Sequence, residues 1–149
     1  MRIFKLAVAL LLLSVWSNAV AQEKYVHLRS WEGKYPTYNK SAQKFFDIPE
    51  VKAPLKKLLS QQDYHLLTKG HTKEMPIQLI DNYLKVRVCG APSSYACIRH
   101  ANFVMNLNDG SIYVALDIFS GKPRYFSSAV GFTELPLNVQ SWQDRKAGT

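Results

Sequence analysis

Tyr83-Leu-Lys-Val-Arg-Val-Cys89 is the stretch that decides the fold, because apolar and basic side chains alternate along it. A period of two is typical of a β-strand that lays one face on a hydrophobic core. We expect an earlier strand to begin near Ile77. The two predicted faces of the central strand carry Leu84, Val86 and Val88 on the apolar side and Lys85 and Arg87 on the other.

Apolar and polar residues alternate again from Cys97 to Leu107, and two turn signals follow. Asn108-Asp-Gly110 predicts a tight hairpin, since glycine readily adopts the positive φ that such turns require. A strand from Ser111 to Phe119 follows, and Ser120-Gly-Lys-Pro123 leads into a further strand, Arg124 to Ser127. The sequence therefore predicts an antiparallel meander of about four to five strands.

Helical patterns flank these strands. From Pro49 to Leu59 apolar residues recur at helical spacing against a lysine-rich face, and Asp47 is placed to cap the first turn. A shorter helical piece spans Asp63 to Leu67, and Leu135 to Arg145 predicts a C-terminal helix. The predicted fold class is therefore α+β, with a central antiparallel sheet packed against an amphipathic helix and a C-terminal helix.

Residues 1–21 are typical of a secretory signal peptide. Arg2 and Lys5 accompany an almost wholly apolar run from Leu6 to Val15, which is shorter than the roughly 20 residues that a membrane-spanning helix needs. Ala19-Val20-Ala21 supplies a cleavage site of the small-x-small type. We expect a mature chain from Gln22 that is periplasmic or secreted and has no integral membrane segment.

The mature chain is expected to form one domain with an N-terminal arm. Residues 22–44 are polar and rich in aromatic side chains without a clear period, which predicts an extended arm lying across the domain. The 128 residues left after cleavage are enough for one domain and too few for two, and we expect that domain to span residues 45–149. The aromatic residues of the arm include Trp31, Tyr35 and Tyr38.

Basic residues outnumber acidic ones. Signal cleavage leaves 17 lysines and arginines against 11 aspartates and glutamates, a net charge of +6. The basic residues are scattered, whereas nucleic-acid binding favours a clustered basic face. We therefore expect no nucleic-acid partner, and expect the charge to lie on a solvated surface or to attract anionic headgroups or cell wall.

The chain has only two cysteines, Cys89 and Cys97. In an oxidising compartment we expect them to form a disulfide that closes the short connection between two strands. A loop held in this way is already rigid when it meets a partner, which favours recognition. The predicted partner-binding loop consists of Gly90, Ala91, Pro92, Ser93, Ser94, Tyr95 and Ala96, with Arg99 and His100 as flanking candidates.

The sequence carries no recognised motif of an enzyme active site. The four histidines lack the i, i+4 spacing of a helical zinc pair, and Cys97 near His100 is expected to be in a disulfide rather than to act as a thiol nucleophile. Neither a glycine-rich phosphate loop nor a nucleophile elbow is present. We expect a protein that is not an enzyme, with no catalytic residues, no metal and no cofactor.

Three stretches within residues 43–127 together resemble the Ivy family, inhibitors of vertebrate lysozyme. They are Phe45-Phe-Asp-Ile-Pro-Glu-Val-Lys-Ala-Pro-Leu-Lys-Lys-Leu-Leu59, the strand ending at Cys89 with the second cysteine after it, and Asn106-Leu-Asn-Asp-Gly-Ser-Ile-Tyr-Val114. The resemblance implies a periplasmic α+β protein, often dimeric, that inserts a disulfide-closed loop into a lysozyme active site. It also implies that residues 45–149 form a single Ivy-like domain.

The best-known members of that family have a loop of the form Cys-Lys-Pro-His-Asp-Cys, whose histidine meets the two catalytic carboxylates of the target. Here the loop holds seven residues and no histidine. Pro92 matches the loop proline, while Ser93, Ser94 and Tyr95 replace the imidazole and the acid. Their hydroxyl groups can donate hydrogen bonds to carboxylates, although without the charge of an imidazolium.

Two classes of function remain open. The first is a protein inhibitor of a lysozyme-like wall-cleaving enzyme, acting through loop 89–97. Animal lysozymes are basic and would repel a protein of charge +6. The second is a periplasmic immunity-type protein against a toxin, or an envelope-associated binding or structural protein. Binding that maps to Trp31 to Tyr38 or to a sheet face would favour this second class. A homodimer is compatible with either class.

Overall fold

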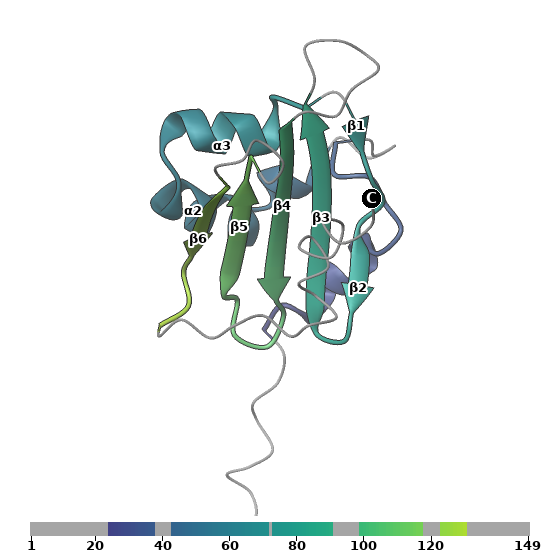
Figure 1. The fold of residues 1–149 in the computed structure, drawn as a ribbon. Helices are drawn as coiled ribbons and strands as arrows, with labels where there is room; N and C mark the ends of the chain where they lie inside the picture. The colour runs from purple at the N-terminus through teal and green to yellow at the C-terminus, as the bar shows by residue number, and fades with distance from the viewer. Residues whose placement is uncertain (1–23, 38–42, 72, 91–98, 118–122, 131–149) are drawn as a thin grey trace, which may run out of the picture.

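A six-stranded antiparallel sheet forms the centre of the protein (Figure 1). The computed structural model describes residues 24–37, 43–71, 73–90, 99–117 and 123–130. The strand order is β1-β3-β4-β5-β6, and β2 also pairs with β3. The strands are β1 (Lys73–Glu74), β2 (Gln78–Ile80), β3 (Tyr83–Gly90), β4 (Arg99–Asn106), β5 (Ile112–Leu116) and β6 (Arg124–Ser127).

The predicted α+β class is confirmed, and the sheet has one or two strands more than the sequence indicated. Strand β6 has the predicted bounds. Strand β1 was not expected, because two residues are too few to show a period. The tight turn before β5 is also confirmed, with Gly110 at φ 78° and its N–H donating to the carbonyl of Asn106 at 2.8 Å.

One face of the sheet carries the hydrophobic core. Val86 pairs with Phe103, and Phe103 pairs with Val114, so that these three side chains form one row across the sheet. All three are at most 2% exposed. The neighbouring rows on the same face are also buried and consist of Leu84, Met105 and Ile112 on one side and Val88, Ala101 and Leu116 on the other.

Helices supply the other half of this core. Phe45 is fully buried, and its ring centroid lies 5.5 Å from Trp31, 5.4 Å from Phe46 and 5.8 Å from Phe103, each in an edge-to-face arrangement. The helices are the 3-10 helices η1 (Val26–Trp31) and η2 (Phe45–Asp47), and the α-helices α2 (Pro49–Leu58) and α3 (Gln61–Thr68).

The predicted cap of α2 is wrong. Ile48 is the N-cap residue, and Asp47 instead ends the 3-10 helix η2. Its carboxylate accepts a hydrogen bond from Lys52 Nζ at 2.9 Å, and this bond lowers the pKa of Asp47. Helix α3 has a true cap, because Ser60 Oγ accepts from the backbone N–H of Asp63 at 3.1 Å.

The N-terminal segment packs against the domain, as expected, but part of it is helical rather than extended. Val26–Trp31 is helical, and Leu28 and Trp31 are only 1% and 7% exposed, because their side chains join the main core. The segment after it is tied to the sheet region by backbone bonds between Gly33 and Ile77 and between Ile77 and Lys34, both of 2.8 Å. Trp31 therefore stabilises the fold and is buried away from any partner.

The face of the sheet opposite the helices is more buried than its basic residues suggest. Lys85 and Arg87 lie on it, as the period of two predicts, but Lys85 is only 1% exposed. Lys85 interacts with a partner there.

Some of the sequence predictions lie outside the described residues. They are the C-terminal helix from Leu135 to Arg145, the signal segment 1–21 and the position of Tyr38.

Two glycines provide a matched test of the turn before β5. Gly110 and Gly33 both have positive φ, 78° and 75°, but a Cβ at Gly110 would lie 2.5 Å from the ring of Tyr25, whereas a Cβ at Gly33 would meet nothing within 4 Å. Gly33→Ala should cost about 1–2 kcal/mol in backbone strain. Gly110→Ala should cost at least about 1 kcal/mol more, through overpacking.

The measurement is urea unfolding of both variants, each also made in a Tyr25→Ala background. The extra cost at Gly110 should disappear when the Tyr25 ring is removed, while the cost at Gly33 should not change. Equal costs at the two glycines would show that Tyr25 does not pack against the turn.

Candidate functional site

The candidate site lies where β3 ends and β4 begins, at one end of the sheet (Figure 1). Gly90 pairs with Arg99 and Cys89 pairs with His100, and these are the last two pairs of an eight-pair antiparallel ladder. Cys89 is in a disulfide, and Cys97 is the chain's only other cysteine. The ladder therefore fixes Gly90 and Arg99, the two residues between which the intervening segment runs.

The structure describes part of the predicted site. Of the predicted loop, Gly90 ends β3, whereas Ala91, Pro92, Ser93, Ser94, Tyr95, Ala96 and Cys97 lie outside the described residues. The flanking candidate Arg99 begins β4, and His100 follows it, half-buried and with an interaction partner.

A row of residues crosses the sheet at the base of the loop. Lys73 of β1 pairs with Cys89 of β3, which pairs with His100 of β4. Paired residues of an antiparallel ladder point to the same face, so the Lys73 and His100 side chains flank Cys89. The sequence predicted His100 here but missed Lys73, because its place depends on the short strand β1.

A buried histidine–glutamate pair holds β1 in place. His71 Nε2 lies 2.6 Å from Glu74 Oε1, and the two side chains are 6% and 11% exposed. The other carboxylate oxygen of Glu74 accepts from the backbone N–H of Thr37 at 3.2 Å. The backbone of Glu74 also pairs with Val88 in the ladder, so this one residue joins the N-terminal segment, the connection after α3 and the sheet.

A second ionic cluster fixes the opposite edge of the sheet. Arg124 of β6 contacts Asp63 of α3 at 2.7 Å and Asp117, just after β5, at 2.9 Å. The hydrogen bonds to Asp117 and Asp63 raise the pKa of Arg124, so this cation is permanent. The cluster connects the helical layer to β5 and β6 and lies away from β1, so we assign it to the scaffold.

Within the described residues, no group of three or more His, Cys, Asp or Glu side chains is arranged to hold a metal ion. Nor does any helix in those ranges have the length and apolar character needed to cross a membrane. What the described geometry provides is a paired, two-stranded base for the segment between Gly90 and Arg99, with Lys73 of the neighbouring strand β1 beside it.

The chain matches no protein-family model, and searches of curated proteins and of solved structures return no significant match. The likeness to the Ivy family therefore depends on the sequence stretches quoted above and carries function only as a proposal.

The disulfide should contribute measurably to stability. For a closed loop of about nine residues, the loop-entropy model gives about 2.5 kcal/mol. We therefore expect Cys89→Ser/Cys97→Ser to lower the free energy of unfolding by about that amount, measured by urea denaturation. Added reductant should destabilise the wild-type protein by a similar amount and leave the serine variant unchanged. Equal sensitivity of both proteins to reductant would contradict this assignment.

Proposed function

We propose that this protein is exported and is a binding protein rather than an enzyme, and that it presents residues 90–96 to a protein partner. The observation that carries the proposal is the disulfide of Cys89 at the end of the eight-pair β3–β4 ladder. A segment fixed at both ends loses little conformational entropy on binding, so more of its contact energy appears as affinity.

We further propose that the partner is a lysozyme-like muramidase, in keeping with the resemblance to the Ivy family. Glycosidases of this kind cleave with a pair of carboxylic side chains in a cleft. Ser93, Ser94 and Tyr95 carry hydroxyl groups that can donate to such carboxylates. Lys73 at the base of the loop adds a positive charge that complements an acidic cleft.

The second candidate function is an immunity-type or envelope-associated protein with a different target. The net charge after cleavage favours it, since a protein at +6 is repelled by basic lysozymes and attracted to acidic partners. Burial of Trp31 removes one residue of the surface that the sequence suggested for this function, while Tyr35 remains 40% exposed. A target of low isoelectric point would be compatible with both candidates.

Inhibition of wall lysis tests the first candidate. The oxidised protein, secreted with its own leader and purified, is titrated against animal-type and bacterial muramidases while residual lysis is measured. We expect stoichiometric inhibition of a muramidase, and loss of inhibition in Cys89→Ser/Cys97→Ser. Tyr95→Ala should raise the inhibition constant about tenfold or more, because aromatic residues dominate the energy of such contacts.

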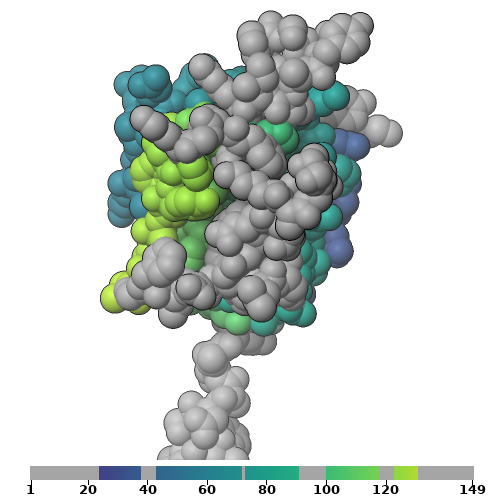
Figure 2. Space-filling view, viewed as in Figure 1, coloured from purple at the N-terminus to yellow at the C-terminus, as the bar shows by residue number. Residues whose placement is uncertain are grey.

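Tyr125→Ala is the matched control. Tyr125 is a tyrosine that is 52% exposed on β6, which Figure 2 shows in yellow-green at the molecular surface. Its replacement should leave inhibition unchanged. Inhibition that survives Tyr95→Ala and the loss of the disulfide, or that falls equally with Tyr125→Ala, would overturn the loop as the binding element. If the folded protein inhibits no muramidase, the second candidate function is the one that remains.

A further inference from the structure

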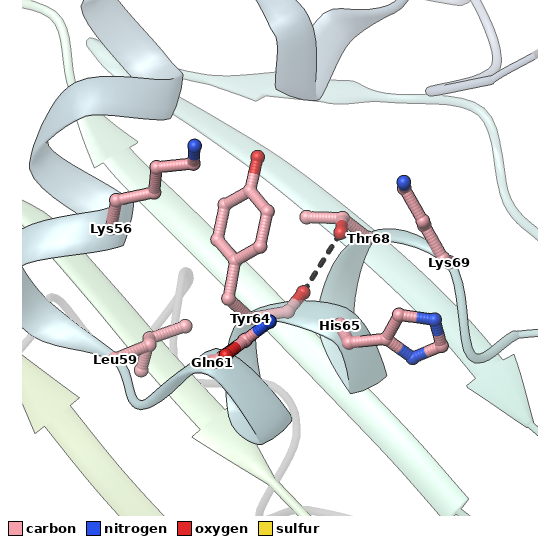
Figure 3. Close-up of a pocket in the computed structure, with 7 residues that line it drawn as sticks. All are labelled: Lys56, Leu59, Gln61, Tyr64, His65, Thr68 and Lys69. Carbon is pink, nitrogen blue, oxygen red and sulfur yellow. Dashed lines mark hydrogen bonds between the residues drawn. The ribbon is translucent and has the colours of Figure 1, made fainter.

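A groove of about 410 Å³ lies on the helical layer, between α2 and α3 (Figure 3). It is separate from the base of the cysteine loop. Its volume is within the range of small-molecule sites, roughly 300–1,000 Å³. The lining residues are Lys56, Leu59, Gln61, Tyr64, His65, Thr68 and Lys69.

The charged groups in the groove lining are all of one sign. Lys56 and Lys69 line it, no acidic residue does, and neither lysine forms an ion pair with any residue in the described ranges. Lys52 is nearby, but its ammonium group is already neutralised by Asp47 at 2.9 Å. Asp47 acts electrostatically on Lys69 from outside the lining. Lys56 and Lys69 nevertheless give the groove lining itself a positive charge.

Tyr64 stands between the two lysines. Figure 3 shows its phenol ring in the middle of the groove, with the Lys56 and Lys69 side chains on either side. The ammonium of Lys56 lies 5.9 Å from the ring centroid. Burial raises the pKa of Tyr64, so its hydroxyl keeps its proton at neutral pH and can donate. Thr68 Oγ1 already donates to the backbone carbonyl of Tyr64 at 2.8 Å.

These donors suit a phosphate group better than a carboxylate. The site has no arginine to form the planar, two-bond fork that carboxylates favour, and lysine binds phosphate as a point charge. A phosphomonoester carries a charge of about −1.5 to −2 and three acceptor oxygens, which matches two ammonium groups and one hydroxyl. The remaining volume can accommodate the organic group attached to the phosphate.

We propose that the groove between α2 and α3 binds a phosphomonoester, with its oxygens between Lys56 and Lys69 and accepting from the Tyr64 hydroxyl. This site is independent of the cysteine loop and adds a second ligand to the proposed function. The phosphomonoester can come from a soluble metabolite or from a lipid headgroup, which share this chemistry.

The test is an NMR titration of the oxidised mature protein with glycerol 3-phosphate, at constant ionic strength in a buffer free of phosphate. We expect saturable shifts of the amide signals of Tyr64, His65, Thr68 and Lys69, with a dissociation constant of about 1–10 mM, since exposed ion pairs are individually weak. Vesicles of phosphatidylcholine with and without phosphatidic acid then separate the two sources. Binding to the acidic vesicles identifies a headgroup, and its absence identifies a soluble phosphomonoester.

Two neighbouring lysines give the matched control. Lys56→Gln should weaken binding of glycerol 3-phosphate about threefold, whereas Lys57→Gln removes the same charge from the same helix outside the groove and should change it by less than about 1.5-fold. Tyr64→Phe should also weaken binding while the fold remains unchanged. Equal losses for Lys56→Gln and Lys57→Gln, or shifts that do not saturate, would overturn the proposal.

Discussion

The eight-pair antiparallel ladder between β3 and β4 is the constraint on which the rest of the structure depends. Since side chains alternate between the faces of a strand, this register fixes which residues enter the core, and a slip of one position would exchange the two faces. Strands β1 and β2 both pair with β3, and β5 pairs with β4, so the ladder also places the remaining sheet. The cysteine loop leaves from its end, which makes the position of the proposed binding segment a consequence of core packing.

Much of this architecture could be predicted from sequence, because strong periods survive in a single chain. The alternation of Leu84, Val86 and Val88 identified the core face, and the bounds of β6 were correct. The failures concern residues whose place depends on distant contacts. Asp47 is a residue type that often caps helices, but here it lies in a 3-10 helix and accepts a hydrogen bond from Lys52. The region around Trp31 shows no period because a short 3-10 helix and the edge-to-face contact of Trp31 with Phe45 hold it.

The candidate site was predicted only in part from the sequence. Two cysteines eight positions apart, in a chain whose first residues are typical of an export signal, were enough to predict the loop, and the structure adds the base that supports it. The pairing of Lys73 with Cys89 could not be read from sequence, since it depends on the buried contact between His71 and Glu74. His71 comes three residues after the end of α3, so the short connection after the helix separates the groove proposed to bind phosphate from the base of the loop. The two proposed binding surfaces therefore share one scaffold while differing in chemistry.

Hydrogen exchange along the β3–β4 ladder tests most directly the claim that the disulfide makes the loop base rigid. Amide protection is compared in the oxidised protein and in Cys89→Ser/Cys97→Ser. The account predicts that protection at Val88–Gly90 and Arg99–Ala101 falls by about tenfold or more in the variant, while Leu84–Val86 and Phe103–Met105 keep protection limited only by global unfolding. Unchanged protection at the loop end of the ladder, relative to the core end, would contradict the claim that the disulfide preorganises the binding segment.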